Sequence, residues 1–252
     1  MGILAGILIP FVGTALGAAM VFFVREWHDS RASQGILGLA SGIMLAASVW
    51  SLLLPSIEMA EERGGVPWLP AAAGMLGGTA FLWLLGRAAE RLNRRKGSAL
   101  SGSAMMCFAV TLHNLPEGMA VGIAFAGARD GHAGMTVAGA AALALGIAIQ
   151  NVPEGAIISL PLRQEGHRRP RAFLLGVLSG AVEPVGAALT LLLTGAVKAV
   201  MPYLLAFAAG AMLYVVADEL IPEAHASGKT SAVAVGTAVG FVLMMTLDVM
   251  LG

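Results

Sequence analysis

Long apolar stretches, separated by short polar segments, run through the whole chain. Each stretch is long enough to cross a bilayer as a helix, which takes about 20 residues. The stretches are continuous rather than alternating in hydrophobicity, which indicates helices and not the strands of a membrane barrel. We therefore predict an all-α polytopic membrane protein with eight transmembrane helices, and we expect a tilt or a break in the long fifth stretch. The predicted spans cover residues 3–24, 35–57, 67–88, 103–127, 133–161, 171–196, 202–223 and 232–251.

The composition of the 252-residue chain agrees with this prediction. Hydrophobic residues make up 58% and charged residues 12% of the sequence, whereas a soluble domain usually carries about 25% charged residues. The formal net charge is zero, so the composition gives no sign of a basic surface for nucleic-acid binding. Because Cys107 is the single cysteine, an intramolecular disulfide is excluded. We expect one membrane domain over residues 1–252 in the cell membrane, whose first stretch is a retained span and not a signal peptide.

The positive charges favour one orientation in the membrane. The loops after the first, third, fifth and seventh spans carry twelve Arg and Lys residues: Arg25, Arg31, Arg87, Arg91, Arg94, Arg95, Lys96, Arg163, Arg168, Arg169, Arg171 and Lys229. The other loops carry three, which are Arg63, Arg129 and Lys198. Because the side richer in Arg and Lys faces the cytoplasm, both termini are predicted to be extracellular or periplasmic.

Polar residues interrupt three of the stretches, and charged groups inside a membrane are costly enough to suggest a function. The fourth stretch contains "TLHNLPEGMAVG", the fifth "AIQNVPEGAIIS" and the sixth "SGAVEPVGA". One glutamate could simply bond to a neighbouring helix, but two copies of one motif and a third glutamate favour a site. The candidate residues are His113, Asn114, Glu117, Gln150, Asn151, Glu154 and Glu183.

Helical spacing brings these residues into register. His113 and Glu117 are four residues apart, so a helix stacks them on one face, and Asn114 precedes Glu117 by three on an adjacent face. Each motif glutamate can therefore serve two neighbouring metal positions. The proline of each motif lacks an N–H and clashes with the carbonyl four residues earlier. We expect kinked helices with spare carbonyl oxygens at Leu112, Ile149 and Gly180.

The candidate residues supply three carboxylates, one imidazole and several amide oxygens, a set that suits a divalent cation. Zinc accepts nitrogen and carboxylate ligands, and cadmium, iron(II) and manganese(II) suit the same set. No thiolate is present, so we expect weak, mixed ligation of an ion that is released again, which makes the metal a substrate and not a cofactor. The two motifs lie in consecutive, antiparallel spans, as expected of an inverted repeat with its substrate site at the midplane.

Two other functions fit an intramembrane metal site. The main alternative is an intramembrane metalloenzyme, such as a protease or a lipid hydrolase. Zinc proteases typically carry His-Glu-x-x-His, however, and only one histidine of this chain lies deep in a span. A passive cation channel stays open as a third reading, because gating leaves no trace in composition.

Acidic residues also lie near the ends of three spans. The outer end of the second span carries Glu58, Glu61 and Glu62. Two interpretations fit these glutamates equally well: they attract cations to an entrance, or they form a solvated helix end. The cytoplasmic end of the seventh span carries Asp218, Glu219, Glu223 and His225, for which an exit relay is favoured slightly over a plain interfacial cap. We expect Asp248, near the C-terminus, to lie at the membrane interface.

The motifs "HNLPEG" and "QNVPEG", the glutamate in the sixth span and "DELIPEAH" in the seventh resemble the ZIP (Zrt/Irt-like) family of metal transporters. The resemblance covers the whole chain and implies zinc transport into the cytoplasm, no enzymatic activity, an eight-helix fold and a frequent homodimer. It also implies that spans 1, 4, 5 and 6 move as a unit against spans 2, 3, 7 and 8. It implies a first metal bound by His113, Glu117, Gln150 and Glu154. It implies a second metal surrounded by Asn114, Glu117, Asn151, Glu154 and Glu183.

This chain departs from the family pattern in three places. Many relatives carry a histidine-rich loop between spans 3 and 4, but this chain has no histidine there. Some bacterial relatives have aspartate where Asn151 stands, so the second metal position has one charge fewer. Many relatives have His-Glu where this chain has Asp218 and Glu219.

Overall fold

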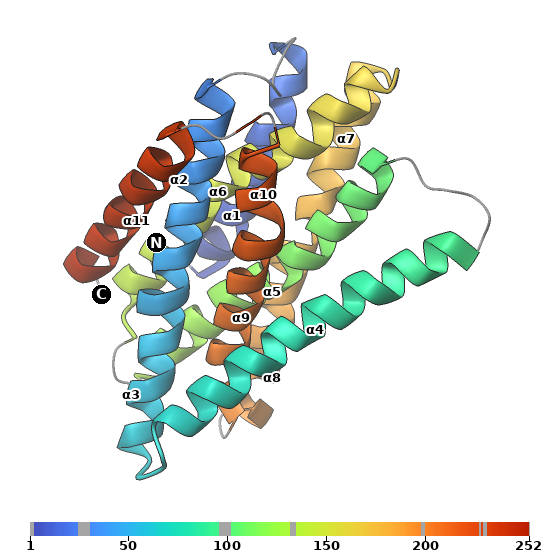
Figure 1. The fold of residues 1–252 in the computed structure, drawn as a ribbon. Coiled ribbons are helices and arrows are strands. Elements are labelled where there is room, and N and C mark those ends of the chain that lie inside the picture. The colour runs from blue at the N-terminus through green and yellow to red at the C-terminus, as the bar shows by residue number, and fades with distance from the viewer. Residues whose placement is uncertain are drawn as a thin grey trace.

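Helices account for almost all of the residues that the computed structural model describes, which are residues 3–24, 31–95, 102–131, 135–197, 200–226, 228 and 231–251. No strand occurs among them. In chain order the elements are α1 (Ile3–Ala19), η1 (Met20–Phe22), α2 (Arg31–Ala47), η2 (Ser48–Leu53), α3 (Leu54–Glu62), α4 (Trp68–Arg95), α5 (Gly102–Asp130), α6 (Val137–Gln164), α7 (Arg169–Gly180), α8 (Val182–Val197), α9 (Met201–Val215), η4 (Val216–Leu220), α10 (Ile221–Ala224) and α11 (Ser231–Leu251). Successive long segments alternate in direction through the bundle, and α4 crosses it obliquely (Figure 1).

Within the described residues, seven segments are long and apolar enough to cross a membrane. They are Ile3–Phe22, Ser33–Glu62, Trp68–Ala88, Val137–Gln164, Arg169–Leu193, Met201–Ala224 and Ser231–Met250, and they coincide with seven of the eight predicted spans. The predicted fourth span falls on α5, a helix of 29 residues that carries the polar motif in its middle and is therefore less apolar than the seven. The all-helical membrane fold is confirmed, whereas eight crossings stay a prediction.

Four close helix pairs build the bundle: α1 with α6, α5 with α8, α2 with α11, and α4 with α9. Each pair meets at glycines that have no side chain to hold the backbones apart. A Cβ atom at Gly13 of α1 would overlap the Ala148 carbonyl of α6, and one at Gly42 of α2 would overlap the Thr237 carbonyl of α11. Such pairs require glycine, which explains much of its abundance in the sequence.

The pairs assemble into two groups of helices. Helices α1, α5, α6, α7 and α8 contact one another and form the first group, and α2, α3, α4, α9, α10 and α11 form the second. The two groups meet mainly where α2 packs against α6 and where α5 packs against α9. This division matches the grouping of spans that the family resemblance implies; the relative motion of the groups stays a prediction.

Interruptions of regular helix fall in the second, sixth and seventh spans and not in the fifth. Helix α6 is continuous over 28 residues although Pro153 and Pro161 lie inside it, so the structure shows no break in the predicted fifth span. The sixth span instead breaks at Ala181, between α7 and α8. The second and seventh spans contain the π-helical segments η2 and η4, each followed within two residues by a proline, Pro55 or Pro222. A π turn accommodates the proline ring by widening the preceding helix.

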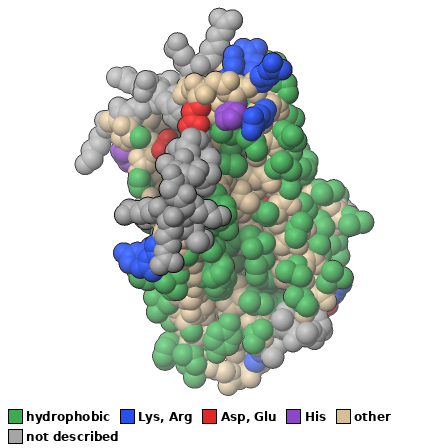
Figure 2. All heavy atoms as spheres, turned by 90° about the vertical axis from the view of Figure 1, so that its right-hand side faces the viewer, with side chains coloured by type: hydrophobic (Ala, Val, Ile, Leu, Met, Phe, Trp, Pro, Cys, Tyr) green, Lys and Arg blue, Asp and Glu red, His purple; other side chains and the backbone are tan. Residues whose placement is uncertain are grey.

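The outside of the bundle is apolar and its middle is polar, the reverse of a soluble protein. Large hydrophobic side chains such as Leu192, at 83% exposure, face outward. Figure 2 shows hydrophobic side chains over the flank of the molecule, with Lys and Arg gathered mainly at its upper end. This is the end at which α6 passes into α7 (Figure 1). The protein is therefore a multi-pass membrane protein whose surface is suited to lipid.

Candidate metal-binding site

Six of the seven predicted site residues lie in the interior between α5, α6 and α8. They are no more than 3% exposed: Asn114, Glu117, Gln150, Asn151, Glu154 and Glu183. The amide nitrogen Nε2 of Gln150 donates a hydrogen bond of 2.8 Å to Oε1 of Glu117, which joins the two motifs directly. Glu154 and Glu183 lie close enough to Glu117 for their charges to interact with it. Segments far apart in the sequence thus bring three carboxyl groups into one buried region.

The two asparagines point their amide nitrogens at backbone carbonyls. Nδ2 of Asn114 donates to the carbonyl oxygen of Ser179, at 3.1 Å, and Nδ2 of Asn151 donates more weakly to that of Pro10, at 3.4 Å. The Asn151 side chain also lies close enough to the carboxyl groups of Glu117 and Glu183 to interact with both. Because the nitrogens are engaged elsewhere, the side-chain oxygens of both asparagines are left for another partner.

The buried side-chain oxygens of this region lack hydrogen-bond partners to an unusual degree. Within the described residues, ten buried side-chain atoms have no hydrogen-bond partner, and seven of these belong to the six site residues. The seven are Asn114 Oδ1, Glu117 Oε2, Gln150 Oε1, Asn151 Oδ1, Glu154 Oε1, Glu154 Oε2 and Glu183 Oε2. Since buried polar groups in proteins are nearly always hydrogen-bonded, a cluster of exceptions requires an explanation. All seven atoms are oxygens, and such a set complements a cation.

The glycine that follows each motif glutamate explains how the neighbouring helices come so close. A Cβ atom at Gly118 of α5 would overlap the Glu183 carbonyl of α8, and one at Gly155 of α6 would overlap the Thr14 carbonyl of α1. The Pro-Glu-Gly sequence therefore supplies both a candidate ligand and a surface for helix packing. The break at Ala181 places Glu183 in the first turn of α8, where the helix dipole favours a negative charge.

Helix α1 contributes to the site through a residue that sequence reasoning missed. Oγ1 of Thr14 donates a hydrogen bond of 2.7 Å to Oε1 of Glu183, and Thr14 is fully buried. The only sequence signal is a hydroxyl residue in the middle of an apolar span. That signal is weak, because threonine in a membrane helix commonly bonds to its own backbone.

Two findings limit the predicted ligand set. The side chain of His113 lies outside the described part of the structure, so its role as a ligand stays a prediction. Among the described residues, no three His, Cys, Asp or Glu side chains converge closely enough to hold a metal ion. The three carboxyl groups are neighbours in one buried region, but they are not gathered around a single point.

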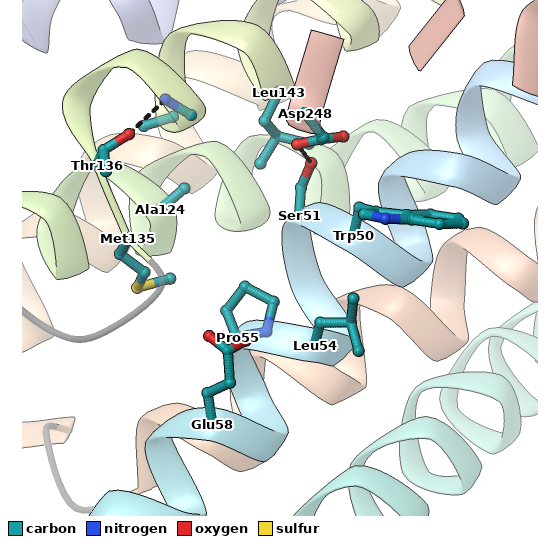
Figure 3. A pocket seen from close by; sticks show the side chains of 12 residues that line it. Trp50, Ser51, Leu54, Pro55, Glu58, Ala124, Met135, Thr136, Leu143 and Asp248 are labelled. Carbon is teal, nitrogen blue, oxygen red and sulfur yellow. Dashed lines mark hydrogen bonds between the residues drawn. The ribbon is translucent and has the colours of Figure 1, made fainter. Parts of the chain in front are cut away.

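A second polar region lies between η2, α3, α5, α6 and α11. It is a cavity of about 210 Å³ whose wall includes Ser51, Glu58 and Asp248 (Figure 3). Oγ of Ser51 donates a hydrogen bond of 2.6 Å to Oδ1 of Asp248, and Asp248 is 8% exposed. Asp248 is therefore buried in the bundle, where the Ser51 hydroxyl from the second span gives its carboxyl group a polar partner; its position at the membrane interface stays a prediction. Glu58 reaches toward this cavity from α3.

The acidic residues of the seventh span lie in the π-helical segment η4. Asp218 is exposed, whereas Glu219 is half-buried and lies close enough to Glu154 for the two charges to interact. A carboxyl group of the second helix group thus lies near the site of the first. The exit relay predicted for this segment stays a prediction.

Comparison with known proteins gives consistent matches over nearly the whole chain. The family model described as "ZIP Zinc transporter" matches residues 86–248, which include all seven candidate residues. Zinc transporter ZIP11 of Homo sapiens is 36% identical, over 95% of this chain and 94% of its own length. Zinc transporter GufA of Myxococcus xanthus is 38% identical, over 97% of both chains. Zinc transporter ZIPB of Bordetella bronchiseptica is 39% identical, over 96% of this chain and 79% of its own length.

Proposed function

The chain belongs to the ZIP family of zinc transporters, and from this premise we propose that it carries zinc across the cell membrane into the cytoplasm. The ion crosses through the buried region between α1, α5, α6 and α8. Residues 1–252 act as one membrane domain. The family and its named relatives are transporters and not enzymes, which disfavours the intramembrane protease or lipid hydrolase.

One observation carries the proposal: seven buried oxygens of the six site residues have no hydrogen-bond partner. Burying polar oxygens without a hydrogen-bond partner is costly. A divalent cation offsets that cost by coordinating several of these oxygens at once. Zinc binds carboxylate oxygen and imidazole nitrogen, so the oxygens and His113 together suit it. The same donors also suit cadmium, iron(II) and manganese(II), which we propose as further candidate substrates.

The site is proposed to hold the ion in two neighbouring positions. The first lies between α5 and α6 and uses His113, Glu117, Gln150 and Glu154. Gln150 serves this position twice, because its nitrogen holds Glu117 while its oxygen is left for the metal. The second position lies toward α8 and uses Asn114, Glu117, Asn151, Glu154 and Glu183. Its support is the closeness of Asn151 to both Glu117 and Glu183.

The proposed topology has α5 as an eighth crossing and both termini outside. Helix α5 has 29 residues and, at about 1.5 Å per residue, exceeds a hydrocarbon core of about 30 Å. An inverted repeat that relates spans 1–3 to spans 6–8 and span 4 to span 5 would exchange the pair α1–α6 with α8–α5. It would also exchange α2–α11 with α9–α4, and η2 with η4. The proposed homodimer rests on the family resemblance alone.

The proposed route begins at the outer cavity and ends at the seventh span. Asp248 and Glu58 give the cavity negative charge on the side where α3 ends, which favours cations. From the central site, Glu219 lies near Glu154 and offers the next carboxyl group on the cytoplasmic path.

Radiolabelled zinc uptake into proteoliposomes tests the proposal. We expect saturable uptake by the wild type, reduced by excess cadmium, manganese(II) or iron(II), and no uptake by Glu117→Ala. The matched control is Glu62→Ala, which removes an exposed glutamate that does not line the cavity and should leave uptake near the wild-type rate. Normal uptake by correctly folded Glu117→Ala would contradict the assignment of the site, and flux that does not saturate would favour a channel.

A further inference from the structure

The hydroxyl group of Thr14 behaves differently from most others in the bundle. Ser41, Ser48, Thr111, Thr237 and Thr246 each donate to the carbonyl four residues earlier in the same helix. Thr14 donates instead across the interior to a carboxylate 169 residues away in the sequence, that of Glu183. The hydroxyl is therefore committed to a side chain of the proposed site and not to its own backbone.

The packing around Thr14 restricts where this hydroxyl can point. A Cβ atom at Gly180, the last residue of α7, would lie 2.8 Å from Cβ and Cγ2 of Thr14 and 2.9 Å from its Oγ1. Gly155 of α6 lies against the Thr14 backbone. Because glycines on two sides admit the threonine and leave it fully buried, few other rotamers are open to it.

The same turn of α1 also contacts the other residue that approaches Glu183. The carbonyl oxygen of Pro10, one turn before Thr14, accepts the hydrogen bond from Nδ2 of Asn151. That bond turns the Asn151 oxygen away from α1, and Oδ1 has no partner. One turn of α1 thus orients two ligands of the proposed second position, each of which retains an oxygen without a hydrogen-bond partner.

We propose that Thr14 is a positioning residue of the second metal position. It holds Oε1 of Glu183, so that the carboxyl group is fixed near Asn151 while Oε2, which has no hydrogen-bond partner, is left for the ion. This inference rests on the proposed function, because it requires Glu183 to be a metal ligand. If Thr14 only joined α1 to α8, its loss would lower the stability of the protein and would not single out one of two bound ions.

The test is calorimetric titration of zinc into purified protein in lipid nanodiscs, in wild type and in Asn151→Asp, which is expected to hold the second ion more firmly. Thr14→Val keeps the shape and removes the hydroxyl. We expect it to lower the affinity for the second ion about tenfold, as the loss of a hydrogen bond to a charged group does. The affinity for the first ion should stay within about twofold of the wild-type value. Thr14→Ser should restore the affinity for the second ion, because it restores the hydroxyl group. Thr237→Val is the matched control, since its hydroxyl bonds only to Val233 in the second helix group.

The outcomes separate this proposal from the one on which it rests. The role of Thr14 would be overturned if Thr14→Val and Thr14→Ala lowered the affinity for both ions equally, or lowered neither affinity. This holds provided that Glu183→Ala abolishes binding of the second ion. If Glu183→Ala leaves the second ion unchanged, or if no second ion binds in either background, the second position itself is wrong. Thermal unfolding of each variant identifies any that is simply misfolded, and Thr14→Ser then decides the question.

Discussion

The two Pro-Glu-Gly motifs share four of six residues but differ in what surrounds them. In both, the asparagine donates to a backbone carbonyl of a neighbouring span, and the glycine admits the backbone of another helix. The glutamates differ: Glu117 has one oxygen bonded to Gln150, whereas neither oxygen of Glu154 has a hydrogen-bond partner. Glu154 is also the one that lies near Glu219 of the second helix group.

The difference indicates separate tasks for two residues of the same type. Glu117 is held by Gln150, so in the proposed site it suits a fixed ligand shared by both positions. Glu154 has no hydrogen-bond partner and lies near Glu219 of the other helix group, so in the proposed site it suits the ligand that passes the ion onward. The repeat therefore provides common packing and, in the proposed site, common ligands, while the residue at its first position, His113 or Gln150, makes the two halves unequal.

The largest effect is expected at the motif glutamates, and Glu154 tests it alongside Glu117. Glu154→Ala should reduce zinc uptake at least about a hundredfold, because it removes one of the three buried carboxylates proposed to balance the charge of the ion. Gln150→Ala should reduce uptake only about tenfold, since it removes one neutral ligand and one hydrogen bond to a charged group. Initial rates of radiolabelled uptake, normalised to folded protein, measure both. Equal losses in the two variants would contradict the distinction between charged and neutral ligands.

The shared role of the motif glycines predicts the next effect, on stability. Gly118→Ala and Gly155→Ala each place a methyl group against the backbone of a neighbouring helix and should destabilise the fold by about 1–3 kcal/mol. Gly86→Ala in α4 is the control, because a Cβ atom there has open space around it and alanine favours the helix. Thermal unfolding in detergent compares the three. A Gly155→Ala protein as stable as Gly86→Ala would show that the α1–α6 contact does not need glycine.

A smaller effect is expected where the two asparagines are compared. Asn151 lies close to two carboxyl groups, so Asn151→Asp adds charge at the second position and should raise the affinity of the second zinc ion about tenfold, one charge–charge contact in a partly screened site. It should also slow release. Asn114→Asp loses the shorter bond to Ser179 and should raise second-ion affinity less. Calorimetric titration measures the zinc stoichiometry and the affinity for the second ion in each protein. Equal affinity for the second ion in wild type and Asn151→Asp would refute the charge argument.

The sequence was sufficient to predict seven of the spans and the polar residues that the structure buries together, whereas metal binding by these residues stays a prediction. Continuous apolar stretches of bilayer length set the helices, and charged residues inside such stretches are rare enough that the two motifs and Glu183 stood out; the structure buries six of these residues together. Interactions between distant segments were not predictable. The bond from Thr14 to Glu183 and that from Ser51 to Asp248 join residues 169 and 197 positions apart, and neither has a local pattern.

The helix interruptions show a second limit of the sequence. Prolines lie in each of the first seven predicted spans, yet α1, α4, α5 and α6 stay continuous, while the sixth span breaks at Ala181 and the second and seventh contain π turns. A proline in the interior of a helix removes one backbone hydrogen bond. Whether the helix breaks, widens or continues depends on which neighbouring groups satisfy the freed carbonyl, and that is set by tertiary packing.

Anomalous X-ray scattering at the zinc absorption edge, on crystals of the zinc-loaded protein, tests the central claim most directly. We predict the strongest peak between α5 and α6, within ligand distance of Glu117, Gln150 and Glu154, with His113 as a further ligand. A weaker peak toward Asn151 and Glu183 should mark the second position. Zinc found only in the outer cavity beside Asp248, with no peak among the motif residues, would contradict the account.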